Sequence, residues 1–309
     1  MSIKAFIPSG GPSLVALATV ESPEPSPGDA LVAVEAFSVN RGEILLLQGG
    51  RTDPPGKDVA GRIARAAADG SGPPLGARVV AHIDGGAWSE LAAVPGDRAV
   101  ELPGEVSSDL AAALPLAGLT ALRLLRAAGE LPGRRVLLTG ASGGVGHFVV
   151  DLAAAAGARV TAVVSSPSRG ERLAALGAEA VVTSVEQAVG PFDIAMESVG
   201  GRGFGQALLK LSRGGLLLWF GQASLEPVVA DFFAVQKGPR DVTIRTFNYW
   251  VEAERDAEDL ATLVKLVADG RLHPEIGAIA DWAETPRVLA ELRDRKVRGN
   301  AVLRLPQLA

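Results

Sequence analysis

A glycine-rich turn between an apolar strand and a helix constrains this chain more than any other feature. The run Val136–Thr139 is short and apolar, as in strands that are buried on both faces of a parallel sheet. Three glycines follow at intervals of three, and Val145–Ala156 then has a helix-forming composition that ends at Gly157. A second apolar run, Arg159–Val164, completes a strand–turn–helix–strand unit.

Such a unit has the properties of a dinucleotide-binding site. Glycines let the backbone approach a pyrophosphate closely, and the helix N-terminus offers N–H groups and the positive end of its dipole. The alternative is a glycine-rich turn in an α/β protein that binds no nucleotide. The complete strand–turn–helix–strand context favours the dinucleotide site.

The end of the second strand indicates which nicotinamide cofactor binds. An NAD site usually carries Asp or Glu there, to bind the ribose 2′-hydroxyl. This chain instead has Ser165 and Ser166, with Arg169 and Arg172 just beyond. Hydroxyl and guanidinium groups suit a 2′-phosphate, so the sequence predicts NADPH, with Arg169 as the stronger candidate. The alternative is that both arginines are solvated surface charges.

Composition excludes several classes of protein. The chain has 309 residues, enough for two domains, and its net charge of −5 gives no reason to expect nucleic acid or an anionic membrane. It has no cysteine and three histidines that are far apart, so we expect no disulfide, no thiolate catalysis and no metal site. The first residues lack the apolar core of a signal peptide, and we expect a soluble cytoplasmic protein.

The pattern of apolar residues differs between the first part of the chain and the rest, which predicts an α/β protein with two domains. Residues 1–113 contain short apolar or alternating runs separated by proline and glycine, a pattern that suits a compact β-barrel-like domain. The following region alternates between strand and helix patterns, which is typical of a doubly wound parallel sheet. A helix is expected over 168–176 in this region, and another over 252–269, after the last strand of the parallel sheet.

Several short segments along the chain form a recognisable series. They include Pro27–Val32, Ser38–Glu43, Pro55–Gly61, Gly85–Glu90, Pro115–Ala121, Ala141–Gly146, Glu197–Gly201 and Gly299–Leu303. In this order they resemble the medium-chain dehydrogenase/reductase superfamily in its zinc-free, quinone oxidoreductase-like branch, and the likeness covers nearly the whole length.

The resemblance implies a GroES-like barrel domain formed by residues 1–114 and 248–309, and a Rossmann domain formed by residues 115–247. It implies NADPH in the cleft between them and hydride transfer to a quinone or an α,β-unsaturated carbonyl compound, without zinc. It also implies a homodimer joined through the edge strand at residues 242–247.

The same resemblance assigns cofactor contacts residue by residue. Asn40 matches an asparagine near the nicotinamide end of the cofactor, where the alternative is a turn-stabilising asparagine. The remaining matches are Thr120, Ser142, Gly143, Gly144, Val145, Gly146, Ser165, Ser166, Arg169, Gly200, Gly221, Phe247 and Asn300.

The proton donor is the least determined part of the prediction. Many relatives carry a tyrosine near the position of Arg51, whereas the only tyrosine here is Tyr249. The candidate catalytic residues are therefore Asn40, Arg51, Lys57 and Tyr249, with solvent as another proton source. Two alternatives stay open: an enoyl-thioester reductase of secondary metabolism, and an NADPH-binding accessory or sensor protein without robust turnover.

Overall fold

The computed structural model describes residues 1–306, which form two compact units. Unit 1 comprises residues 1–119 together with the chain from Glu252 onward, and unit 2 comprises Thr120–Val251. The chain leaves unit 1 along α3 (Pro115–Ala128), whose first residue is the proline. Among the described residues, no helix is long and apolar enough to cross a membrane.

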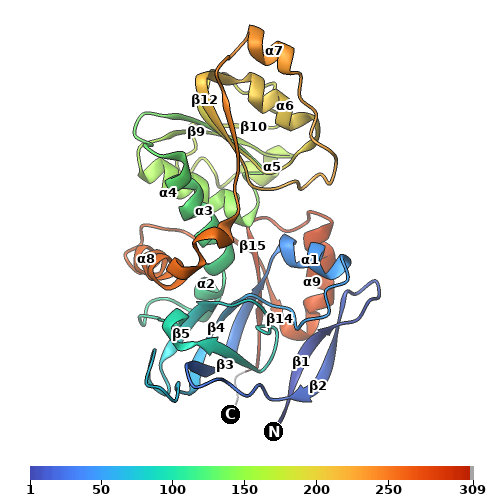
Figure 1. Ribbon diagram of the computed structural model, residues 1–309, viewed down its shortest axis with the longest axis vertical. Helices are drawn as coiled ribbons and strands as arrows, with labels where there is room; N and C mark the ends of the chain where they lie inside the picture. The colour runs from blue at the N-terminus through green and yellow to red at the C-terminus, as the bar shows by residue number, and fades with distance from the viewer. Residues whose placement is uncertain (307–309) are drawn as a thin grey trace. The chain divides into compact units, whose positions relative to one another are not determined.

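Unit 2 is built on a six-stranded parallel sheet (Figure 1). The strand order is β10-β9-β8-β11-β12-β13, which is the doubly wound order that reverses direction between β8 and β11. Helices α4 and α6 lie on opposite sides of these strands in Figure 1. The elements are β8 (Arg135–Thr139), α4 (Gly144–Ala155), β9 (Arg159–Val163), α5 (Pro167–Gly170), β10 (Ala180–Val182), β11 (Phe192–Glu197), α6 (Gly201–Leu209), β12 (Leu211–Trp219), α7 (Phe232–Lys237) and β13 (Thr243–Thr246).

Unit 1 is a mainly antiparallel sheet domain. Its seven-stranded sheet runs β14-β15-β3-β4-β5-β7, with β6 paired to β3, and β1 and β2 form a separate hairpin. The elements are β1 (Ser2–Pro8), β2 (Val15–Glu21), β3 (Asp29–Val39), α1 (Arg41–Gln48), β4 (Asp58–Arg65), β5 (Arg78–His82), β6 (Leu91–Pro95), β7 (Val100–Glu101), α2 (Ser108–Ala112), α8 (Asp256–Ala268), β14 (Ile276–Asp281), α9 (Thr285–Arg293) and β15 (Asn300–Arg304). The predicted fold class is confirmed.

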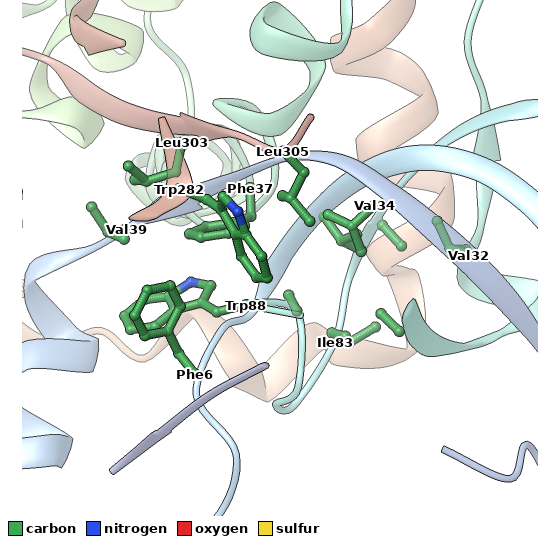
Figure 2. Packing of buried hydrophobic residues seen from close by; sticks show 14 of the residues in the cluster. Phe6, Val32, Val34, Phe37, Val39, Ile83, Trp88, Trp282, Leu303 and Leu305 are labelled. Carbon is green, nitrogen blue, oxygen red and sulfur yellow. The ribbon is translucent and has the colours of Figure 1, made fainter. Parts of the chain in front are cut away.

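Aromatic side chains pack among aliphatic ones in the core of unit 1 (Figure 2). Trp88 is fully buried and stacks on Phe37 with ring centroids 5.8 Å apart, while Phe6 meets Trp282 edge to face at 5.7 Å. The indole Nε1 of Trp88 also donates a hydrogen bond of 3.1 Å to the carbonyl oxygen of Ser38. This bond fixes the end of β3, which leads directly into Asn40 and α1.

Some elements differ from the sequence prediction. The helix expected over 168–176 is shorter in the structure: it ends at Gly170, and the chain continues as turns. Gly170 packs tightly against β10, since a Cβ added there would be 2.5 Å from Val181. The helix expected from 252 begins at Asp256, after a 3-10 segment at Tyr249–Arg255. Helix α1 and strands β1 and β14 were not predicted.

Candidate functional site

In the turn between β8 and α4, the backbone packs closely against the first residues of the helix. Gly140 adopts a φ of +65°, a left-handed conformation that favours glycine. Gly146 lies so close to the preceding turn that a Cβ there would be 2.4 Å from the carbonyl oxygen of Ala141. Gly143 is the N-cap of α4, so the N–H groups of the first helical turn have no partners within the helix. The geometry fits a bound pyrophosphate.

The predicted 2′-phosphate corner lies beside this turn. Ser165 and Ser166 come one residue after the end of β9, and Ser166 is the N-cap of the short helix that carries Arg169. The Nε of Arg169 donates a hydrogen bond of 3.1 Å to the Oγ of Ser142, within the glycine turn. The structure therefore joins two parts of the predicted cofactor site that are 27 residues apart in sequence. Arg172 lies beyond them with an exposed side chain.

A buried carboxylate links the ends of β8 and β11, where the strand order reverses. Glu197 is fully buried, and its Oε1 accepts hydrogen bonds from Thr139 Oγ1 at 3.1 Å and from the N–H groups of Val199 and Gly200. The Oγ1 of Thr139 in turn accepts from the N–H of Ser198 at 3.0 Å. Burial raises the pKa of the Glu197 carboxyl. In doubly wound sheets, ligands bind at the strand ends beside this reversal.

The remaining predicted cofactor residues of unit 2 occupy loops and helix positions. Gly200 adopts a φ of +78° as the N-cap of α6, and Gly221 follows β12 against the backbone of Ser198. Phe247 follows β13 and donates its N–H to the carbonyl oxygen of Trp219 at 2.8 Å. Thr120 is buried on α3. Gly200, Gly221 and Phe247 thus lie at or just after the carboxyl ends of their strands.

In unit 1, Asn40 belongs to a polar network that the sequence reading did not assign. Its Nδ2 donates to the Oδ2 of Asp58 at 2.7 Å and to the Oγ of Ser38 at 3.1 Å. Asp58 is almost fully buried and also accepts from Ser38 Oγ at 2.6 Å, His82 Nδ1 at 2.9 Å and the N–H of Leu116 at 3.1 Å. The network therefore fixes the side chain of Asn40.

Glu43 joins the same network from the first turn of α1. Its Oε2 accepts a hydrogen bond of 2.8 Å from the N–H of Asn40, the helix N-cap, in a capping-box arrangement. Its Oε1 is buried and has no hydrogen-bond partner. Burial, with a smaller contribution from the charge of Asp58, raises the pKa of Glu43 to about 8. Glu43 is therefore largely a neutral acid at pH 7.

The other candidate residues lie in different surroundings. Lys57 is half-buried next to Asp58, and its charge acts to lower the pKa of Glu43. The Nη2 of Arg51 donates to the carbonyl oxygen of Asp84 at 2.9 Å. Tyr249 belongs to unit 2 and packs edge to face on Trp250, 5.4 Å between centroids.

Asn300 has a structural partner in unit 1. Its Nδ2 and its backbone N–H both donate to the carbonyl oxygen of Glu275, at 3.1 and 2.8 Å. Within residues 1–306, no group of three or more His, Asp or Glu side chains is arranged to hold a metal ion.

Two sequence signals could have identified the missed residues. The spacing Asn40-x-x-Glu43 is that of a capping box, which predicts a helix start rather than a loop. Asp58 and His82 are polar residues next to apolar strand segments, a position that requires hydrogen-bond partners once buried.

Comparisons with known proteins agree with this architecture. The family model "Zinc-binding dehydrogenase" matches residues 144–268. The chain is 29% identical over 319 residues to a quinone oxidoreductase of Pseudomonas aeruginosa, covering 96% of this chain and 98% of that protein. It is 28% identical over 292 residues to the polyketide synthase GfsB of Streptomyces halstedii, covering 90% of this chain but only 5% of the synthase.

A solved structure extends the likeness to three dimensions. The mycobacterial protein Rv1454c, complexed with NADPH, superposes with a TM-score of 0.87 at 25% identity, covering 98% of this chain and 99% of that one. Nearly the whole of each chain is therefore similar in fold to the other.

Proposed function

Because the chain belongs to the medium-chain dehydrogenase/reductase superfamily, in its quinone oxidoreductase branch, we propose that it is an NADPH-dependent oxidoreductase acting on a small molecule. The substrate is a quinone or an α,β-unsaturated carbonyl compound, and no zinc takes part. The observation that carries the choice of cofactor is the hydrogen bond between Arg169 and Ser142, which sets a guanidinium group beside the glycine turn. The relative of known structure named above was solved with NADPH.

When bound, NADPH supplies a hydride for the acceptor carbon. The chain's residues bind and orient it. The first turn of α4 binds the pyrophosphate through N–H groups, and Ser142, Ser165, Ser166 and Arg169 bind the 2′-phosphate. Thr120, Gly200, Gly221, Phe247, Asn300 and Asn40 line the rest of the cofactor.

Four side chains are proposed to act on the acceptor or on the nicotinamide end: Asn40, Arg51, Lys57 and Tyr249. Arg51 stays charged throughout, because a guanidinium group does not lose its proton in proteins. It can therefore bind developing negative charge but cannot supply a proton. Lys57, Tyr249 or solvent supplies the proton that completes the reduction.

The experiment that tests the proposal is a steady-state assay that follows the nicotinamide absorbance band. Purified protein is mixed with NADPH or NADH, and with 1,4-benzoquinone or a simple enone. Oxidation of NADPH in preference to NADH with either acceptor supports the proposal. Tight NADPH binding without oxidation across a panel of acceptors supports an accessory or sensor role instead.

A second candidate is an enoyl-thioester reductase of secondary metabolism. The similarity to a segment of a polyketide synthase is the observation that favours it. An α,β-unsaturated thioester added to the same assay separates the two candidates. A specificity constant for the thioester well above that for quinones and simple enones would favour this second function.

The assembly is proposed to be a homodimer joined through the edge of the parallel sheet. Within the described chain, β13 pairs with β12 alone, and Ile244 on it is exposed. An outer strand with unpaired backbone groups is suited to pairing with a second copy. Light scattering after size exclusion tests this, with Ile244→Lys expected to give a monomer and Arg245→Lys as the control that keeps the dimer.

A further inference from the structure

The side-chain nitrogen of Asn40 donates its hydrogen bonds inside unit 1. It lies 2.7 Å from the Oδ2 of Asp58 and 3.1 Å from the Oγ of Ser38. A third acceptor, the Oε2 of Glu43, lies 3.5 Å from the same nitrogen. The donor end of the amide is therefore directed at groups of the protein.

The reverse orientation of this amide is excluded by the surroundings of Asp58. A flipped amide would place an oxygen 2.7 Å from a carboxylate oxygen, and neither atom could donate a hydrogen bond. Three further donors, Ser38 Oγ, His82 Nδ1 and the N–H of Leu116, converge on the two oxygens of Asp58, so its surroundings match a group that accepts hydrogen bonds.

These contacts leave Oδ1 as the acceptor end of the amide. The capping box turns it toward the N–H of Glu43, and its second lone pair is the group that Asn40 offers to a ligand. Asn40 is half-buried, whereas Ser38, Asp58 and His82 are buried behind it. A carbonyl oxygen accepts hydrogen bonds and cannot donate one. Asn40 is consequently matched to a hydroxyl or amide N–H, and is unsuited to the carbonyl oxygen of a quinone or enone.

We propose that Asp58 is a positioning residue that fixes Asn40 as a hydrogen-bond acceptor, and that Asn40 binds a donor group at the nicotinamide-riboside end of the dinucleotide. The proposal rests on the proposed function for its ligand, but the orientation of the amide does not depend on that function. It assigns Asn40 to holding the cofactor. Stabilisation of negative charge on the acceptor's oxygen then falls to other groups, among which Lys57 and Arg51 carry the required charge.

The first test reads the amide directly and needs no cofactor. The chain has three asparagines, Asn40, Asn248 and Asn300, so selective ¹⁵N-asparagine labelling gives three side-chain NH₂ pairs in an NMR spectrum. Asn248 is exposed and Asn300 donates to Glu275, so they provide a fast-exchanging and a protected reference. Disappearance of one pair in Asn40→Leu assigns the signal.

In the wild-type protein, both hydrogens of Asn40 are expected to exchange with solvent more slowly than those of Asn248. In Asp58→Asn, the amide of residue 58 can donate toward Asn40, so Asn40 turns its oxygen inward and its NH₂ outward. At least one of its hydrogens then loses protection. Exchange of the wild-type Asn40 pair as fast as that of Asn248 would overturn the proposal.

The second test measures NADPH binding and kinetics in matched variants. Asp58→Asn is expected to raise the Kd and the KM for NADPH about tenfold, the effect of about 1.4 kcal/mol, with a smaller effect on kcat. Ser38→Ala is the control, because it removes one hydrogen bond to the amide yet keeps Asp58 and hence the orientation. Its Kd is expected to stay within about twofold of the wild-type value.

The double variant Asn40→Asp, Asp58→Asn separates positioning from general damage to the fold. Residue 58 then donates to the carboxylate at residue 40, whose other oxygen again faces outward as an acceptor. Its NADPH affinity is expected to recover most of the loss seen in Asp58→Asn. The proposal is overturned if Asp58→Asn folds and binds NADPH as tightly as the wild type. It is also overturned if the double variant binds NADPH no more tightly than Asp58→Asn.

Failure of the proposed function gives a different pattern. If the wild-type protein binds no NADPH, the ligand assigned to Asn40 is wrong together with that function. Protection of the Asn40 amide in the NMR experiment then still decides whether Asp58 fixes its orientation.

Discussion

Thr139 and Glu197 join the ends of two neighbouring parallel strands through a buried hydrogen bond of 3.1 Å. The two residues are 58 positions apart in sequence and end β8 and β11, the pair at which the strand order reverses. Through Glu197, the loop that leads into α6 is held against the strand that leads into the glycine turn. Both loops belong to the proposed cofactor site.

Removal of the Glu197 carboxylate should therefore cost both stability and NADPH affinity. Glu197→Ala leaves the buried N–H groups of Val199 and Gly200 without their acceptor, and we expect a loss of about 2–4 kcal/mol of unfolding free energy. Glu197→Gln keeps one oxygen for these groups and should lose about half as much or less. Urea denaturation at pH 7 measures both variants. Equal stability of Glu197→Ala and wild type would contradict the structural role of this carboxylate.

Arg169 should distinguish NADPH from NADH. Arg169→Ala removes a charge-assisted contact with the 2′-phosphate, and we expect NADPH affinity to fall about 10- to 100-fold, while NADH affinity changes little. Arg172→Ala is the matched control, since its side chain is exposed one turn further on. Fluorescence titration of each variant with both nucleotides measures the effect. An equal loss for NADPH and NADH would contradict a 2′-phosphate contact at Arg169.

Glu43 should make the stability of the protein depend on pH. Its pKa is about 8 in the folded state against 4.5 as the ordinary value, so the folded state holds a proton that the unfolded state releases between these limits. Its contribution is thus fully present below about pH 4.5 and is lost as the pH rises to about 8. At about 1.4 kcal/mol per unit of pKa, the loss amounts to several kcal/mol.

The variant Glu43→Gln should lack this dependence, because its amide does not ionise. We expect it to differ little from wild type at pH 5 and to be more stable than wild type at pH 9. Chemical denaturation of both proteins at pH 5, 7 and 9 gives the comparison. Parallel curves for the two proteins across this range would show that Glu43 does not titrate as inferred.

Close packing at Gly146 should make the glycine turn intolerant of a methyl group. A Cβ there would meet the backbone of Ala141 at 2.4 Å, so Gly146→Ala should destabilise the protein by about 2 kcal/mol or more and weaken NADPH binding. Gly203→Ala on α6 is the control, since no atom lies within 4 Å of its added Cβ. It should stabilise the protein by up to about 1 kcal/mol. A tolerated Gly146→Ala would contradict this geometry.

The parallel half of the fold could be predicted from the sequence because most of its strands, β8, β9, β11 and β12, are local apolar runs followed by a turn and a helix. The glycine turn and the predicted 2′-phosphate site at Arg169 lie within one such unit, so local spacing was sufficient to predict that they lie close together. The strands of unit 1 were only partly recognised, and α1 was missed because Arg41 and Gly42 follow Asn40 without a helical pattern.

The network around Asn40 could not be predicted because it depends on strand register. Asp58 and His82 face each other across β4 and β5 although they are 24 residues apart, and a shift of one residue would turn them to opposite faces. Asn40 itself was found through resemblance, whereas its partners required the three-dimensional pairing of β3, β4 and β5. Glu197 was visible in the sequence, but its link to Thr139 depends on the order of strands in the sheet.

The central claim is that this protein is an NADPH-dependent reductase, and one measurement tests it most directly. Purified protein is titrated with NADPH and with NADH by fluorescence, and nicotinamide absorbance is then followed after addition of 1,4-benzoquinone or a simple enone. We predict tighter binding of NADPH than of NADH, and oxidation of NADPH by at least one acceptor. If the protein bound neither nucleotide, this would contradict both the dinucleotide site at the glycine turn and the reductase function that depends on it.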